Sequence, residues 1–347
     1  MFRRIITLGL AAMAAGLSWA QQPVEGLAYY LPQTTVKVRL LVEHTTFQPG
    51  RLAVYGQQFL RQPCGMERQD SYRICGATMY AEALPDTARR YEVNLDRKKS
   101  IFTIDCDENG VLMAVNDKGA KASLPAHFKP ARQAQPLNPD NFMTADMLAA
   151  GSNSKLAELV AQEIFDIRDA RNQISRGESD QMPKDGEQLR LMLNGLDQQE
   201  TALLQLFRGT TTTDTTETEV AFIPKKDTPK LIAFRFSKRL GMLDADDLGG
   251  SPYYINVEQL NDVAMPELPP SDKKKEEPAL FVAVPAKIRV SLGLPAQQPI
   301  CTKELYAAQF GDVYGLSTEL FSKKQITHLR LNPVTGVVEH LEVEPVK

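Results

Sequence analysis

The stretch Thr35-Val-Lys-Val-Arg-Leu-Leu-Val-Glu-His44 alternates between apolar and charged residues. In an extended chain successive side chains point to opposite faces, so the apolar residues share one face and the charged residues share the other. The pattern predicts a strand buried on one side, with these residues facing inward: Val36, Val38, Leu40 and Val42.

The residues after this strand continue the β pattern. Pro49 and Gly50 mark a turn, after which apolar residues recur at the spacing of a short helix. Three further strand-like runs follow, over residues 91–96, 101–106 and 111–115. A turn at Gly110 leads into the last of them. We interpret residues 21–116 as an N-terminal β unit and residues 117–140, which contain four prolines, as a linker.

The period changes to helical between residues 141 and 209. Two apolar stripes recur every three to four positions, one formed by Leu156, Val160, Ile164, Ile167 and Ile174 and the other by Leu189, Met192, Leu196, Leu203 and Leu206. A polar loop with Gly177 and Gly186 separates them. This arrangement predicts a long antiparallel helical hairpin.

The second stripe is interrupted by a charged residue. Glu200 stands where an apolar residue is expected, and Arg168 and Arg171 lie in approximate antiparallel register with it on the first helix. The sequence leaves two alternatives, a buried ion pair between Glu200 and these arginines or charges solvated at the surface.

The rest of the chain returns to strand-like patterns. We interpret residues 210–260 as a β-hairpin segment and residues 261–279 as a charged, Pro-rich linker. Residues 280–347 read as a second β unit, with a short helix over residues 304–310. The predicted fold class is α+β, with two mostly antiparallel β units flanking a long antiparallel helical hairpin.

The first twenty residues have the pattern of a secretory signal peptide. Arg3 and Arg4 precede an apolar run over residues 5–17, which is too short to span a bilayer, and small residues follow up to Ala20. Cleavage there leaves Gln21 as the mature N-terminus. No later apolar run is long enough to cross a membrane, so we expect an exported protein, in the periplasm or in the outer-membrane-associated cell envelope.

Charge and composition exclude several classes of function. The 347 residues carry 40 Lys and Arg against 43 Asp and Glu, a formal net charge of −3. This balance provides no basic surface for the phosphates of a nucleic acid. Apolar residues make up 43% and charged residues 24%, which is ordinary for globular chains. The length of 347 residues, more than twice that of a typical domain, predicts two or three globular units.

Four cysteines follow the signal peptide, and export permits them to oxidise. Cys64 and Cys75 are closest in sequence and flank a polar loop, so they are the candidate disulfide, while the other pairings with Cys106 and Cys301 stay open. The sequence has no Cys-x-x-Cys, and its histidines are scattered. A zinc site is therefore not predicted.

One acidic motif imitates a metal site. Asp105-Cys-Asp107-Glu-Asn109-Gly110 resembles the start of an EF-hand calcium loop, but the twelfth position, which requires a bidentate Glu, is Asn116. We interpret the motif as a polar turn and predict no metal and no cofactor. The sequence also lacks a nucleophile elbow and a phosphate-binding loop, so no catalytic residue is assigned.

Short motifs spread over nearly the whole chain are Tyr30-Leu-Pro-Gln-Thr-Thr35, Pro49-Gly50 before Tyr55, residues 171–177 with Asp185-Gly186, and Phe234-Arg-Phe236 leading to Pro252-Tyr-Tyr254. In these motifs the chain resembles an uncharacterised family of exported envelope proteins, a domain of unknown function, from Gram-negative gut and oral anaerobes. The resemblance implies secretion and a two-part β architecture around a helical hairpin. It brings no activity, cofactor or catalytic residue.

Exported proteins of such bacteria also resemble one another in a short O-glycosylation sequon, in which Asp precedes Ser or Thr and then a small or apolar residue. Asp86-Thr87-Ala88 and Asp214-Thr215-Thr216 are similar to it. The resemblance therefore implies Thr87 and Thr215 as candidate O-glycosylation sites.

The leading functional hypothesis is a non-enzymatic envelope protein that acts as a binding or assembly module, with an envelope protein or a glycan as partner. Phe165 and Phe207 lie off the main helical stripes, so each either docks on a β unit or forms part of a partner-binding patch. Docking is favoured for Phe207. The alternative function is an exported hydrolase of glycans or peptides that uses two carboxylates. The oligomeric state stays open.

Overall fold

Three antiparallel sheets make up most of the protein. A computed structural model of the chain describes residues 26–94, 99–129, 135–178, 185–260 and 278–346. The first sheet has the order β2-β1-β5, the second β10-β9-β8-β6-β7 and the third β12-β11-β4-β3. Their bounds are β1 Gly26–Gln48, β2 Gln69–Asn94, β3 Ile104–Cys106, β4 Leu112–Val115, β5 Thr210–Phe222, β6 Lys230–Ser237, β7 Gly241–Leu243, β8 Ser251–Gln259, β9 Leu280–Gly293, β10 Cys301–Leu316, β11 Gln325–Leu331 and β12 Val338–Pro345.

Two long helices form where the apolar stripes predicted them. The Ser152 hydroxyl accepts from the backbone N–H of Lys155 and starts α3, which ends at Gly177 in the left-handed conformation. The Asp185 carboxylate accepts from the N–H of Glu187 and starts α4. The helical elements are η1 Ala53–Tyr55, α1 Gly56–Phe59, η2 Pro139–Phe142, α2 Ala145–Leu148, α3 Asn153–Arg176, α4 Gly186–Arg208 and η3 Thr318–Phe321.

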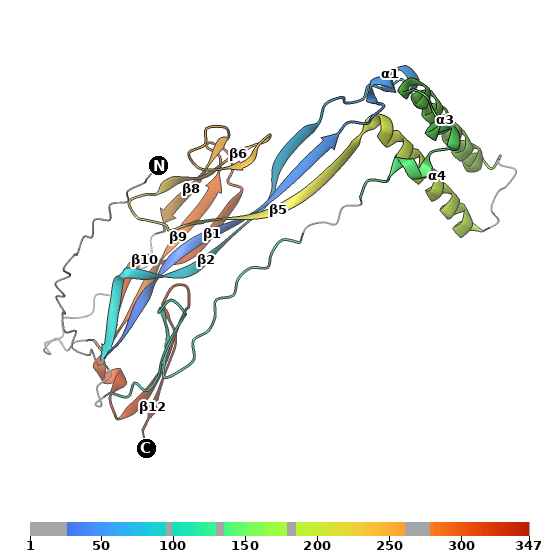
Figure 1. Ribbon diagram of the computed structural model, residues 1–347. Helices are drawn as coiled ribbons and strands as arrows, with labels where there is room; N and C mark the ends of the chain where they lie inside the picture. The colour runs from blue at the N-terminus through green and yellow to red at the C-terminus, as the bar shows by residue number, and fades with distance from the viewer. Residues whose placement is uncertain (1–25, 95–98, 130–134, 179–184, 261–277, 347) are drawn as a thin grey trace, which may run out of the picture.

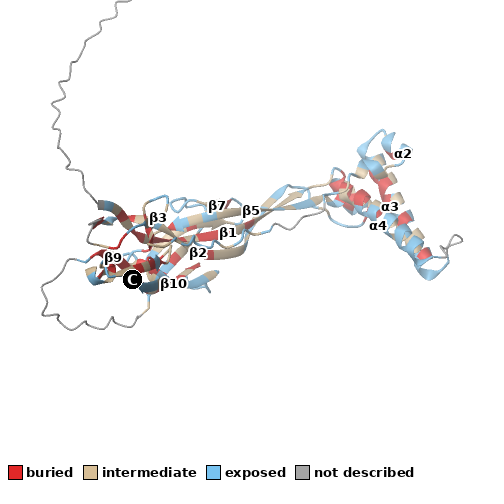
Figure 2. Ribbon diagram, turned by 90° about the horizontal axis from the view of Figure 1, so that it is seen from below, coloured by how far each residue is buried: buried red, intermediate tan, exposed pale blue. Residues whose placement is uncertain are grey.

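The molecule is elongated and has three parts. In Figure 1 the five- and four-stranded sheets form a β body at one end, and α1, α3 and α4 form a helical tip at the other. The long strands β1, β2 and β5 run from the body to the tip. We call the intervening part the neck, defined as residues 43–48, 69–73 and 210–215. Figure 2 shows buried residues gathered in the body and in the tip and largely absent from the neck.

The upper half of the body is a two-sheet sandwich. The apolar face of β1, predicted from alternation, is confirmed: Val36, Val38 and Leu40 are fully buried. They pack against the inward face of the five-stranded sheet, which supplies Phe234, Ile255, Ile288, Val290 and Leu292. Alternation on both inner faces makes one continuous core, as in other sandwiches.

A second core, which we call the basal core, lies at the base of the body. It combines Tyr29 and Leu31 from the start of β1 with Leu112 from β4 and Leu329 and Leu331 from β11. The Tyr29 hydroxyl donates to the carbonyl of Phe281 and accepts from its N–H. The basal core therefore joins segments from both ends of the chain.

The tip has its own core. Val160, Ile164 and Leu203 of the two helices pack with Leu52, which precedes η1. Gly50 lies so close to α4 that a Cβ there would stand 2.3 Å from the carbonyl oxygen of Leu206, so the turn requires glycine at this position. This contact fixes the helices to the end of the β1–β2 hairpin.

The fold class expected from the sequence is wrong. The described residues are mostly β, and the helices do not lie between two β units: they cap one end of the long sheet (Figure 1). The two β units are also not separate, because β11 pairs with β4. Apolar periodicity indicates elements but not their partners, so strands distant in sequence were assigned to different units.

A second correction concerns residues 304–310, which were expected to be helical. They belong to β10, whose register against β9 shifts between Ala307 and Asp312. Leu305 and Ala307 form one alternating pair of inward residues, and Ala308 and Phe310 form a second pair, so all four are buried. This spacing imitates a helical stripe.

Parts of the expected organisation lie outside the described residues. These parts are the signal peptide over residues 1–20 and nearly all of the linker over residues 261–279. The other expected linker, residues 117–140, has no strand within its described residues, 117–129 and 135–140, and η2 begins at its end. We call residues 117–129 the strap. The strap lies against the three-stranded sheet, since the Arg39 guanidinium donates to the carbonyls of Pro125 and Ala126.

Candidate functional site

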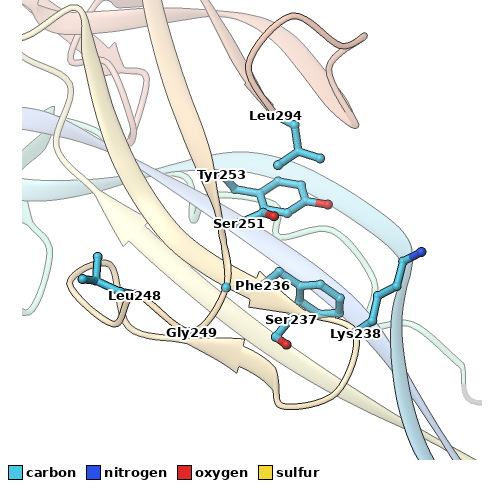
Figure 3. Close-up of a pocket in the computed structure, with 9 residues that line it drawn as sticks. Phe236, Ser237, Lys238, Leu248, Gly249, Ser251, Tyr253 and Leu294 are labelled. Atoms are coloured by element: carbon cyan, nitrogen blue, oxygen red, sulfur yellow. The ribbon is translucent and has the colours of Figure 1, made fainter.

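A groove lies where the body meets the neck, and it has two parts. One part, of about 380 Å³, is lined by Phe236, Ser237, Lys238, Leu248, Gly249, Gly250, Ser251, Tyr253 and Leu294. The other, of about 760 Å³, is lined by Glu67, Arg68, Gln69, Asp70, Ser237, Arg239, Leu240 and Gly249. Ser237 and Gly249 line both parts, so the two lie side by side. Figure 3 shows the first part, with Tyr253 between Leu294 and Phe236.

The wall of the groove is aromatic and packs against the buried core. Tyr253 on β8 stacks on Phe234, with 4.9 Å between ring centroids, and meets the edge of Phe236 at 6.3 Å. Phe234 belongs to the buried core, so the Tyr253 ring is held from behind. Burial raises the pKa of the Tyr253 hydroxyl, which therefore stays protonated and can donate a hydrogen bond at neutral pH.

Glycines let the loops that form the groove approach the strands. A Cβ on Gly250 would stand 2.8 Å from the backbone carbonyl carbon of Phe236, so the loop before β8 crosses β6 only with glycine there. Gly241, which begins β7 with a φ of 79°, packs its backbone on the Tyr72 ring. The N–H of Tyr72 donates to the carbonyl of Lys238, which joins β2 to the β6–β7 turn.

Asp70 is a residue of the neck and lines the larger part of the groove. Its Oδ1 accepts from the Thr46 hydroxyl at 2.8 Å and lies 3.0 Å from His44 Nε2, and its Oδ2 accepts from Arg68. The Thr46 hydroxyl, the His44 ring and the Arg68 guanidinium hold the pKa of Asp70 below its usual range. Asp70 is therefore ionised at neutral pH, and both of its oxygens are engaged.

This cluster contains a hydroxyl, an imidazole and a carboxylate, yet its geometry is not that of a catalytic triad. In a triad one imidazole nitrogen faces the carboxylate and the other faces the nucleophile. Here the same atom, His44 Nε2, lies near both Asp70 and the Thr46 oxygen, and Thr46 donates its proton to Asp70. The hydroxyl is therefore held by the carboxylate and is not activated by the ring.

Of the charged residues that the structure describes, the most buried lies outside the groove, on the opposite face of the three-stranded sheet. Arg39 donates to Glu219 at 2.8 and 2.9 Å, to the Tyr80 hydroxyl and to the strap. The Tyr80 hydroxyl and the Arg39 guanidinium hold the pKa of Glu219 below its usual range. This network holds the strap on the sheet, so the charges of Arg39 and Glu219 have a structural role.

The structure places Glu200 between the two arginines singled out in the sequence. Its carboxylate lies 2.6 Å from Arg168 Nε and 2.9 Å from Arg171 Nη1, and the residue is 8% exposed. Arg171 also contacts Asp197 at 2.7 Å. The cluster joins α3 to α4 within the tip and is distant from the groove.

The two phenylalanines differ. Phe207 is fully buried in the tip core, whereas Phe165 is 39% exposed and lies under the Arg168 guanidinium. Phe207 therefore packs inside the tip, and Phe165 contributes to its surface.

The structure does not bring Cys64 and Cys75 together. Both are free thiols: Cys64 lies beside Gly56 in the tip, and the Cys75 Sγ donates to the carbonyl of Leu41 on β1. Cys64 precedes Gln69, where the β1–β2 pairing reaches the tip, and Cys75 lies six strand residues beyond Gln69, so the two residues are too far apart for the Cα separation of about 4 to 7 Å that a disulfide needs. Cys106 and Cys301 are also free.

The remaining candidates are surface residues and a turn. Thr87 on β2 is exposed, and Thr215 on β5 is partly exposed. In the acidic motif, Asp107 Oδ1 accepts from the N–H groups of Asn109 and Val111, which makes a polar turn between β3 and β4. Among the described residues no group of His, Cys, Asp and Glu is arranged to hold a metal ion.

Fold and groove together define an elongated, mostly β protein with an aromatic groove in its body and a helical tip. The chain belongs to the family described as "Domain of unknown function (DUF4831)", whose family model matches residues 25–339. Neither a curated protein nor a solved structure matches the chain significantly. Within the described residues, no helix combines the length and apolar character needed to cross a bilayer.

Proposed function

We propose that this protein is an exported, non-enzymatic component of the cell envelope whose groove binds a segment of glycan. The observation that carries the proposal is the two-part groove with an aromatic wall and with the hydroxyls of Tyr253, Ser237 and Ser251 beside it. A sugar ring has an apolar face of C–H groups, which suits an aromatic ring, and a rim of hydroxyls, which suits serine and backbone groups.

The groove favours recognition over reaction. A glycosidase needs one carboxyl group that donates a proton and a second that acts as base or nucleophile. Glu67 and Asp70 both line the larger part, which is the observation in favour of a hydrolase. Asp70 is ionised, which excludes it as the proton donor, and both of its oxygens are engaged by Thr46, His44 and Arg68, which makes it poorly suited to act as base or nucleophile.

The test is calorimetric titration of the full mature chain with soluble peptidoglycan fragments. We expect saturable binding that Ser251→Trp abolishes, because the indole fills the groove beside Tyr253. Asn256→Trp is the matched control, since Asn256 is exposed on the same strand but does not line the groove. Equal binding by both variants would refute the groove as the site. Fragments that are shortened by the wild type and left intact by Glu67→Gln would establish the hydrolase.

Location rests on the first twenty residues alone. Export predicts that mass spectrometry of protein from the envelope finds a chain beginning at Gln21. Envelope material that still begins at Met1 would contradict this.

A further inference from the structure

Within the described part of the chain, the last strand of the four-stranded sheet is a free edge. β12 ends the order β12-β11-β4-β3 and is hydrogen-bonded to one strand, β11. It lies at the base of the body, away from the tip (Figure 1). Every residue from Leu341 to Val346 is exposed, although five of the six belong to the strand. A strand edge of this kind presents unpaired N–H and C=O groups to solvent.

Apolar side chains of β12 lie beyond the end of the basal core. Leu341 is opposite Leu329 and Val343 is opposite Thr327, so each pair projects to the same face of the sheet. Leu329 and Thr327 are 0% exposed, whereas Leu341 and Val343 are 43% and 41% exposed. The core therefore stops at β11, and the same face of β12 is left open.

The other face of β12 carries two glutamates and one histidine, His340, whose Nε2 lies 3.4 Å from Glu342 Oε2. Glu342 and Glu344 alternate with the two apolar residues, and both are exposed. β12 itself contains no Lys or Arg. A second copy of β12 added antiparallel would place these glutamates on one face together with their counterparts, which is unfavourable. The charge pattern instead favours a strand in which basic residues alternate with apolar ones.

We propose that β12 is an acceptor edge for β-strand addition by an extended segment of a partner protein, in which Lys or Arg alternates with apolar residues. The backbone of the partner pairs with the free edge of β12, its apolar side chains cover Leu341 and Val343, and its basic side chains face Glu342 and Glu344. This surface is separate from the groove, and its use does not depend on what the groove binds.

The test uses a synthetic peptide of alternating Lys and Val with the length of β12, eight residues. We expect it to bind the full mature chain in calorimetry at low salt and to slow hydrogen exchange of the β12 amides. The same peptide with its two central amides N-methylated, which blocks both edges of the strand, should not bind. A peptide of the same composition with all lysines in one block should bind about tenfold more weakly.

Charge reversal locates the contact. The double variant Glu342→Lys and Glu344→Lys should weaken binding of the basic peptide about tenfold and gain binding of an alternating Glu and Val peptide. Glu178→Lys, an exposed glutamate on the tip, is the matched control and should bind like the wild type. Unchanged binding by the double variant, protection outside β12, or a dimer that protects β12 without peptide would each overturn the proposal.

Discussion

Glu200 is a carboxylate held inside the tip by two arginines, and its removal should be measurable. In Glu200→Gln the guanidinium groups of Arg168 and Arg171 lose the charge that both of them contact. We expect the tip to lose about 1 to 3 kcal/mol of unfolding free energy, the range for hydrogen bonds to charged groups, because the arginines are only partly buried. Urea unfolding followed by circular dichroism at the helical band measures it.

A matched control is available on the other long helix, α3. Glu158 pairs with Lys155 on the exposed face of α3. An exposed pair contributes about 0.5 kcal/mol or less, so Glu158→Gln should leave the midpoint nearly unchanged. If Glu200→Gln and Glu158→Gln lost the same unfolding free energy, the Glu200 cluster would stabilise the tip no more than a solvent-exposed ion pair does.

Glu219 makes the attachment of the strap sensitive to acid. Its pKa is held below the usual value near 4.5 by Tyr80 and Arg39. A carboxylate whose pKa is lowered by folding adds stability above its usual pKa, and this stability is lost as the pH falls through the lowered value. The wild type should therefore exceed Glu219→Gln in urea midpoint at pH 7, and the difference should shrink below about pH 4.5.

Glu344→Gln, in the exposed part of β12, controls for the loss of one acidic side chain. Its difference from the wild type should stay small at both ends of the pH range. A Glu219→Gln difference of the same size at pH 3 and at pH 7 would show that the network contributes nothing through ionisation.

At the scale of whole elements, α4 depends on one aromatic side chain. Phe207 is fully buried in the tip core, so Phe207→Ala leaves a cavity and should cost about 3 to 5 kcal/mol. Phe165→Ala, on the exposed side of α3, should cost roughly 1 kcal/mol or less. Helical circular dichroism during thermal unfolding compares them. Similar melting temperatures would mean that the tip core does not rest on Phe207.

Elements with one strong period were predictable, and their partners were not. The alternation around Val38 and the stripes of α3 and α4 are local patterns, so they indicate the elements directly. The irregular strand β10 was mistaken for a helix because its shifted register brings inward residues to helical spacing. Which strand pairs with which depends on contacts between distant segments, such as that of β11 with β4.

The groove was not predictable for the same reason. Its lining comes from the start of β2, the β6–β7 turn, the loop before β8 and Leu294, which meet only through sheet pairing. The motif Pro252-Tyr-Tyr254 includes Tyr253, but alternation alone does not show that its ring lines a cavity. The Glu200 cluster, in contrast, lies between two helices whose antiparallel register can be counted from the sequence.

At the scale of the whole molecule, the separation of tip and body predicts a large radius of gyration. A compact domain of this length has a radius of gyration of about 20 Å. The neck holds the tip beyond the end of the body (Figure 1), so small-angle X-ray scattering should give a clearly larger value and a distance distribution with a long tail. A symmetric distribution near the compact value would contradict the extended arrangement.

The basal core also sets the order in which the newly made chain can fold. The Thr34 hydroxyl near the start of β1 donates to the carbonyl of Val334, 300 positions later. At about 5 to 20 residues per second, roughly 15 to 60 s of synthesis separate the two residues. The elements of the tip are complete once Arg208 has been made, so the tip can fold early. Tyr29 and Leu31 cannot pack in the basal core until β11 has been made. During that interval the first strand exposes apolar surface, so the nascent chain is expected to need a chaperone at β1 until its last strands are made.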